Sequence, residues 1–174
     1  IKRRQAAEKA NRIWHCAKPA VNHAYLKRKK IKPHNTKINS HYGSLLIPIY
    51  NEQLKLVSLQ FVGADGSKTF LKGGEKKNCF CWLGNPTDTV LIAEGFATSA
   101  SLHEYKGLQT FVAFDAGNLE NVAKVVRANR PTAEIIIAGD NDESGVGQKA
   151  SNTAAQAVHG KVMIPKIVGA DWND

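Results

Sequence analysis

The spacing of hydrophobic residues along the chain changes twice and indicates three parts. Over residues 4–30, Ala, Ile, Trp and Leu recur at helical intervals, and Pro19 marks an expected break between two helices. Residues 31–42 are polar and typical of a linker. We therefore expect a helical segment over residues 1–43.

Short apolar runs separated by turn residues characterise residues 44–84. Asp65-Gly66 and Gly73-Gly74 stand between such runs, and Asp-Gly between two alternating runs is a common hairpin signal. This pattern predicts a small antiparallel β subdomain.

From residue 85 onward, continuous apolar strands take turns with helices. The apolar runs occupy residues 89–95, 108–117, 133–142 and 161–165, and the helical patterns occupy residues 96–107, 118–130 and 144–160. Strands of this kind are typical of a parallel sheet that is covered on both faces and has right-handed crossovers. We predict an α/β fold for residues 85–174, with about four strands in a mainly parallel sheet flanked by helices.

The uneven distribution of charge indicates a class of partner. The 174 residues carry a net charge of +9, yet residues 1–40 contain 12 Lys or Arg and one acid, Glu8. The remaining residues have a net charge of −2. A basic segment of this kind suits a polyanion, usually nucleic acid, and the alternative is a solvated helix face.

The cysteines and the ends of the chain indicate its setting. Cys16, Cys79 and Cys81 are too few for a disulfide framework, which favours a reduced, cytoplasmic location. They lack the paired spacing of a zinc ribbon, so zinc is not expected within this fragment. No apolar run reaches the length of a membrane span, so no membrane partner is expected, and the start at Ile1 indicates an excised or processed piece.

Acidic residues follow three of the predicted parallel strands. Glu94, Asp115, and Asp140 with Asp142 stand where these strands end. Ligands gather at the carboxyl ends of parallel strands, and neighbouring strands lie about 4.8 Å apart. If the first and third strands are neighbours, Glu94, Asp140 and Asp142 converge on a site for Mg²⁺ or Mn²⁺, because hard oxygen ligands favour these ions.

Two other interpretations of these acids stay open. Asp142 or Ser144 is a suitable N-cap for the third helix, because both side chains accept hydrogen bonds from helix amides. A solvated acidic loop is the other alternative. Asp115 fits a turn and cap as well as it fits a metal site.

Together these motifs resemble the Toprim domain. In that family one apolar strand ends in Glu-Gly and a later strand carries Asp-x-Asp, here Glu94-Gly95 and Asp140-Asn141-Asp142. Either motif alone is weak, whereas the two together, with strands and helices between them, are specific.

The resemblance extends to DNA primases of the bacterial, phage and plasmid type. Residues 44–84 look like the basic subdomain that precedes Toprim there, and its Lys-aromatic-Leu motif is present as Lys68-Thr69-Phe70-Leu71 with an extra Thr. The stretches "AYLKRKKI" at residues 24–31 and "GADWND" at residues 169–174 are similar to further primase motifs.

This resemblance implies metal-dependent synthesis of short primers from nucleoside triphosphates on a single-stranded DNA template. It implies catalytic and metal-binding roles for Glu94, Asp140 and Asp142, with Asp171 and Asp174 as further metal ligands. Contacts to nucleotide or nucleic-acid phosphates are assigned to Arg3, Arg4, Lys27, Arg28, Lys29, Lys30, Lys68 and Lys72.

The chain also departs from the primase pattern. It has no zinc ribbon and no helicase P-loop, so a replicative helicase is expected in a missing region or in a separate chain. Thr98 stands where bacterial primases often carry another acid. Two alternatives stay open: another Toprim phosphotransfer enzyme, such as a nuclease or a topoisomerase-like protein, and a non-catalytic module that binds nucleic acid.

Overall fold

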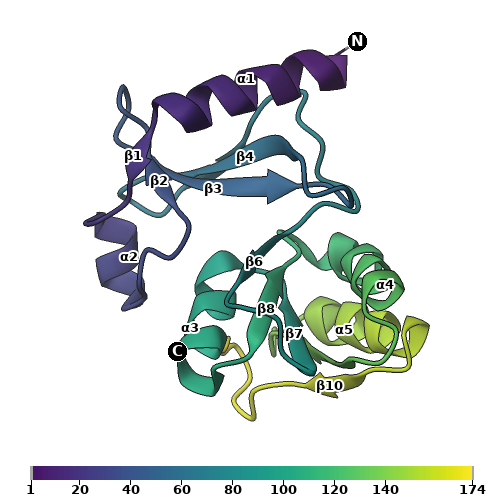
Figure 1. The fold of residues 1–174 in the computed structure, drawn as a ribbon. Coiled ribbons are helices and arrows are strands. Elements are labelled where there is room, and N and C mark those ends of the chain that lie inside the picture. Colours follow the sequence, from purple (N-terminus) through teal and green to yellow (C-terminus); the bar gives the residue numbers. More distant parts are fainter. Residues whose placement is uncertain (1, 174) are drawn as a thin grey trace. The chain divides into compact units, whose positions relative to one another are not determined.

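The computed structural model describes residues 2–173 and divides the chain into two compact units, Ile1–Cys81 and Trp82–Asp174. The first unit combines helices with an antiparallel sheet, and the second is a layered α/β structure (Figure 1). The predicted fold class is therefore confirmed. Among the described residues, no helix has the length and apolarity that crossing a membrane would require.

An antiparallel sheet forms the centre of the first unit. Its five strands follow the order of the sequence: β1 (Lys18–Pro19), β2 (Lys37–Ile38), β3 (Leu45–Tyr50), β4 (Leu56–Val62) and β5 (Lys68–Phe70). Helix α1 (Lys2–Cys16) precedes the sheet, and α2 (Ala24–Lys29) lies between β1 and β2 in the sequence. The expected helix break is present, because Pro19 is in an extended strand that pairs with Lys37.

Helix α1 packs on β4 through two alanines. Ala6 and Ala10 lie one helical turn apart and are buried against Leu59 and Leu71. Small side chains at these positions let the helix backbone approach the strand closely. Packing of this apolar face supplies most of the stability of a single helix of this length.

A five-stranded sheet forms the centre of the second unit. Its order is β10 (Lys161–Met163), β9 (Glu134–Ala138), β7 (Thr89–Ala93), β8 (Gln109–Val112) and β6 (Cys81–Leu83). Strand β7 pairs in parallel with both β8 and β9, and β9 pairs in parallel with β10. The run that contains β6 was expected in the hairpin subdomain, but the structure places it at the edge of the parallel sheet.

Three helices cover the second sheet. They are α3 (Phe96–Lys106), α4 (Leu119–Asn129), which follows a short 3₁₀ turn at Ala116–Asn118, and α5 (Val146–Ala157). Helix α3 lies on one face of the sheet, and α4 and α5 lie on the other (Figure 1). Val90, Leu91 and Ile92 are completely buried in the central strand, which explains why its sequence shows no polar alternation.

Removal of the Leu59 side chain tests the packing of α1 on β4. We expect Leu59→Ala to lower the free energy of unfolding of the first unit by roughly 2–5 kcal/mol, because the residue is completely buried. Amide hydrogen exchange in α1 and β4 measures the effect. Leu54→Ala is the matched control, since Leu54 is 59% exposed. In this variant the free energy of unfolding from hydrogen exchange in α1 and β4 should change by less than about 0.5 kcal/mol. Equal effects of the two substitutions would contradict the packing.

Candidate metal centre at the ends of the parallel strands

The register of the parallel sheet brings the predicted acidic positions to one edge. Ala93 at the end of β7 pairs with Ala138 of β9 and with Val112 of β8. Glu94 follows Ala93 directly, and Asp140 comes two residues after Ala138. The expectation that the first and third strands are neighbours is confirmed. Both carboxylates belong to half-buried residues at the carboxyl ends of adjacent strands.

The backbone beyond β8 adopts an unusual conformation beside Glu94. The amide of Phe114 donates a hydrogen bond of 2.8 Å to the carbonyl of Glu94, which extends the pairing past the strand ends. Phe114 has a φ of 72°, a left-handed conformation that is rare for a bulky residue. Such strain persists only where the surrounding structure enforces it, and it occurs often at functional sites. Asp115 follows at the start of the 3₁₀ turn and is half-buried.

Asp142 binds the first amides of helix α5. Its carboxylate accepts hydrogen bonds from the amides of Val146 and Gly147, at 3.2 and 2.6 Å, and from the Ser144 hydroxyl. The Ser144 hydroxyl and then the Gly147 amide lower the pKa of Asp142 below its usual value. The side chain of Asp142 therefore caps the first amides of α5, but the N-cap position itself is occupied by Gly145 and not by Asp142 or Ser144 as predicted. These hydrogen bonds use most of the accepting capacity of the carboxylate.

Asn141, between the two aspartates, is a hydrogen-bonding centre that the sequence analysis missed. Its backbone bonds to Ala170 and Gly169, and its side-chain amide donates to the carbonyl of Pro165 at 2.8 Å. Its side-chain oxygen accepts a hydrogen bond of 2.7 Å from Gln148 of α5. The loop that carries Asp140 and Asp142 is thereby attached both to α5 and to the C-terminal segment. In the sequence, this role is indicated only by the amide side chain of Asn141, which can both donate and accept hydrogen bonds within the Asp-x-Asp motif.

The C-terminal segment docks against the same loop through Trp172 and Asn173. The indole of Trp172 donates to the carbonyl of Gly139 at 3.0 Å, and its ring packs on the core between β7 and α3. Asn173 donates to Ser101 of α3 at 2.8 Å and, through its backbone, to the Asp171 carboxylate. Asp171 thus belongs to a segment whose backbone is hydrogen-bonded to Asn141, next to Asp140. Asp174, also predicted as a metal ligand, lies outside the described residues.

Gly139 is required by the close approach of α5. A Cβ atom at this position would lie 2.3 Å from the Ser151 hydroxyl oxygen and 2.9 Å from the Ser151 Cβ. Ser151 is completely buried and donates to the carbonyl of Gly147, so it has little room to move. The glycine before Asp140 therefore allows the strand end and the helix to pack directly against each other.

The donor chemistry of this edge suits a hard divalent cation. Glu94, Asp140 and Asp142 supply only carboxylate oxygens, which Mg²⁺ and Mn²⁺ prefer. Among residues 2–173, however, no three His, Cys, Asp or Glu side chains lie close enough together to form a complete metal site. Mg²⁺ usually binds through one or two carboxylates together with substrate phosphates, so an incomplete protein shell is compatible with such an ion.

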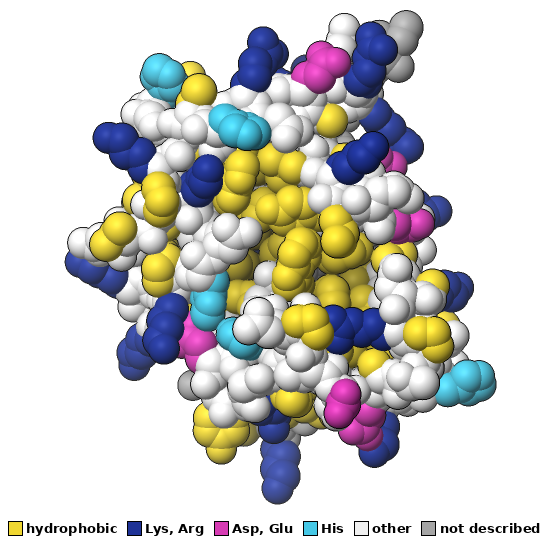
Figure 2. All heavy atoms as spheres, viewed as in Figure 1, with side chains coloured by type: hydrophobic (Ala, Val, Ile, Leu, Met, Phe, Trp, Pro, Cys, Tyr) yellow, Lys and Arg dark blue, Asp and Glu magenta, His cyan; other side chains and the backbone are white. Residues whose placement is uncertain are grey.

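The basic residues predicted to bind phosphates all lie in the first unit. Lys and Arg side chains gather over α1, at the top of Figure 2. Some of them already have partners: Arg3 forms an ion pair with Glu75 at 3.0 Å, and Arg4 pairs with Glu8 at 3.6 Å. The exposed members of the predicted set are Arg3, Arg4, Lys27, Arg28, Lys30, Lys68 and Lys72, whereas Lys29 is half-buried.

A pH titration tests the cap at Asp142. Because the pKa of the folded carboxyl is lowered, its contribution to stability is present above the unfolded value of about 3.9 and is lost as the pH falls through the folded pKa. We expect Asp142→Asn to weaken this part of the acid dependence of unfolding, measured by urea denaturation between neutral and acidic pH. Glu143→Gln, which alters the exposed neighbouring acid, should retain the dependence of the original chain. A carboxyl ¹³C titration with an ordinary midpoint would argue against the cap.

Comparison with known proteins identifies a family for the second half of the chain. Residues 89–174 match the family model of the Toprim domain. A DNA primase TraC from Escherichia coli is 35% identical over 160 residues, which cover 84% of this chain and 11% of that protein. A second Escherichia coli DNA primase TraC is 34% identical over 154 residues, which cover 81% of this chain and 14% of that protein. The chain thus spans about a tenth of the length of these curated relatives.

Solved structures share the fold at low sequence identity. The primase fragment of the bacteriophage T7 primase-helicase protein superposes with a TM-score of 0.64 at 17% identity, covering 91% of this chain and 74% of that one. The DnaG primase catalytic domain bound to single-stranded DNA gives a TM-score of 0.65 at 9% identity, covering 99% and 74%. Residues 89–174 are therefore a Toprim domain by the family model, and the chain shares the fold of these primase catalytic cores.

Proposed function

We propose that this chain is the catalytic core of a DNA primase, which joins nucleotides into short primers on a single-stranded DNA template. The observation that carries the proposal is the adjacency of Glu94 and Asp140 at the ends of β7 and β9. The curated relatives are named DNA primases, which supports this reaction over other Toprim chemistry. A replicative helicase is the expected partner, in another part of the protein or in a separate chain.

Glu94 and Asp140 are the proposed ligands of a catalytic Mg²⁺ or Mn²⁺ ion. A bound divalent ion would neutralise the charge that develops on the α-phosphate and on the departing pyrophosphate. Asp142 is the third candidate ligand of the same ion, and its carboxylate also holds the start of α5. Asp171 is a further candidate ligand, because its segment is attached to the Asp140 loop.

Proton transfer is the second role open to Glu94. Deprotonation of the primer 3′-hydroxyl requires a base within hydrogen-bonding reach, and carboxylates act in this way in many enzymes. Glu94 lies at the carboxyl end of β7, immediately before Gly95, the N-cap residue of α3. Lys68 and Lys72 are exposed in the first unit and would contact phosphates of the nucleotide or of the nucleic acid.

Primer synthesis on single-stranded DNA with Mg²⁺ or Mn²⁺ is the direct test. We expect Glu94→Gln and Asp140→Asn each to reduce the rate by roughly 10²–10³-fold or more, because each removes electrostatic stabilisation of the transition state. Glu143→Gln is the matched control, since Glu143 is an exposed acid in the same loop. Glu143→Gln should retain the activity of the original chain. Chelation of the metal should abolish the activity of the original chain and of Glu143→Gln alike.

The other Toprim activities predict different results in the same assay. Cleavage of DNA without incorporation of nucleotides would replace the primase proposal with a nuclease. Binding of DNA without either reaction, unchanged in both carboxylate variants, would indicate a non-catalytic module.

Lys30 offers a clean test of template contact by the basic run at residues 27–30. Lys30 is the C-cap residue that follows α2, and its φ is 53°. Lys30→Gly therefore removes a charge and relieves backbone strain. We expect stability to rise by up to about 1 kcal/mol, while the salt dependence of DNA binding weakens by about one unit of slope. The control is His159→Gly, at a φ of 51° in the second unit, which should raise stability and leave the slope unchanged. An unchanged slope in Lys30→Gly would exclude this residue from the template contact.

A further inference from the structure

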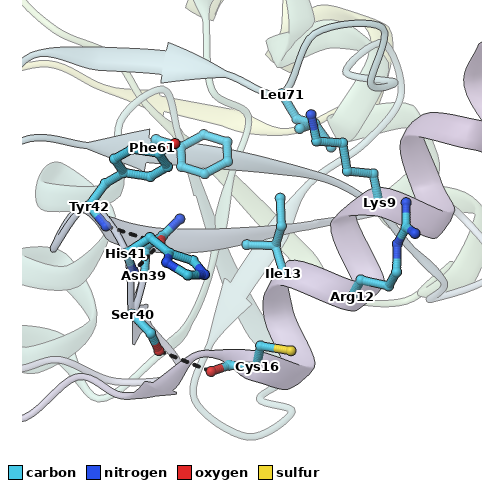
Figure 3. A pocket seen from close by; sticks show the side chains of 10 residues that line it. All are labelled: Lys9, Arg12, Ile13, Cys16, Asn39, Ser40, His41, Tyr42, Phe61 and Leu71. Carbon is cyan, nitrogen blue, oxygen red and sulfur yellow. Dashed lines mark hydrogen bonds between the residues drawn. The ribbon is translucent and has the colours of Figure 1, made fainter.

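A pocket in the first unit is lined by none of the residues that were proposed above to bind metal or phosphates. It has a volume of about 440 Å³, within the range of roughly 300–1,000 Å³ that is usual for ligand sites. Its lining comes from the second half of α1, from the loop between β2 and β3, from β4 and from the segment after β5 (Figure 3). The lining residues are Lys9, Arg12, Ile13, Cys16, Asn39, Ser40, His41, Tyr42, Phe61 and Leu71.

The pocket has an apolar floor and a basic rim. Ile13, Phe61 and Leu71 supply the floor, and Lys9 and Arg12 extend along one side from α1 (Figure 3). Both cations are exposed, and among residues 2–173 neither forms an ion pair or a side-chain hydrogen bond. Arg3 and Arg4 on the same helix do have acidic partners, at Glu75 and Glu8. None of the described residues that line the pocket is acidic, so its charge is complementary to an anion with an apolar or aromatic part.

The loop between β2 and β3 has a backbone ordered by hydrogen bonds and carries an exposed aromatic side chain. Asn39 accepts hydrogen bonds from the amides of His41 and Tyr42, at 2.9 and 3.3 Å, and Ser40 ties the loop to the last turn of α1 through the Cys16 carbonyl at 3.1 Å. Tyr42 is nevertheless 87% exposed. An exposed tyrosine on an ordered loop, opposite the partly buried Phe61, is well suited to stack a planar ring.

We propose that this pocket binds an unpaired base of single-stranded nucleic acid, with the adjoining phosphates at Lys9 and Arg12. Aromatic stacking combined with cations that follow the backbone is the usual way in which proteins hold single strands. An acidic peptide would satisfy the cations but would not need the tyrosine. The inference rests on the proposal that the chain acts on single-stranded nucleic acid, and it adds a second contact in the first unit, separate from the carboxylates.

Binding of oligo(dT) to the complete chain, without metal or nucleotides, tests the pocket independently of catalysis. We expect Tyr42→Ala to weaken binding by roughly 5- to 150-fold, the range measured when a stacking aromatic is removed. Tyr105→Ala is the matched control, because Tyr105 is 88% exposed and lies on α3 of the second unit. Arg12→Gln should lower the slope of binding against salt by about one unit. Since these side chains are exposed, none of the substitutions should unfold the chain.

Cys16 provides a reporter inside the pocket. It is exposed, whereas Cys79 and Cys81 are buried, and burial raises the pKa of Cys79 to about 12. A neutral maleimide should therefore alkylate Cys16 first, as mass spectrometry can verify. We expect oligo(dT) to slow this reaction strongly, and an abasic oligonucleotide of equal length and charge to slow it much less.

The outcomes separate this inference from the primase proposal. The chain could make no primers while oligo(dT) protects Cys16 and binds Tyr42→Ala more weakly. This result would support the pocket and count against primer synthesis. Equal affinities of Tyr42→Ala and Tyr105→Ala would overturn the pocket, even if primers are made. Equal protection by the abasic strand would show a contact to phosphates alone, and protection only by an acidic peptide would show a protein-binding groove. Either result would overturn the base-binding inference.

Discussion

The parallel pairing of β7 with β9 is the constraint on which the candidate centre depends. It places Glu94 and Asp140 at one edge although 45 residues separate them in the sequence. The pairing is stabilised by complete burial of the central strand between helices on both faces. The loop beyond β9 is then fixed by Asn141, which bonds to α5 and to the C-terminal segment at once. Core packing and the geometry of the carboxylates are therefore not independent.

The two units differ in charge. Residues 1–81 contain 17 Lys or Arg and 4 acids, whereas residues 82–174 contain 7 and 11. The basic first unit would attract a polyanion such as the proposed template, and the acidic second unit would attract the proposed divalent cation. The ion pairs Arg3–Glu75 and Arg4–Glu8 reduce the attraction locally, whereas Lys9 and Arg12 on the same helix form no ion pair with the residues that the structure describes.

The sequence predicted those parts of the fold that depend on local patterns. Continuous apolar runs followed by acids predicted the parallel strands, and Asp65-Gly66 marked the turn between β4 and β5, because both signals act over a few residues. The place of β6 was not predictable, since its alternation of buried and half-buried residues fits either sheet. The roles of Asn141 and Trp172 and the pocket beside α1 were also missed, because their partners are distant in the sequence. For Asp142 the cap and the metal interpretation were both open, and the structure establishes the cap.

The cap at Asp142 affects how inactive variants of this protein can be interpreted. One carboxylate begins a helix and stands within the motif that is proposed to bind metal, so its removal disturbs local folding and ligand geometry together. An inactive Asp142 variant would therefore not distinguish a lost ligand from a displaced helix. A catalytically inactive form for trapping complexes is better made at Asp140, which leaves the start of α5 intact.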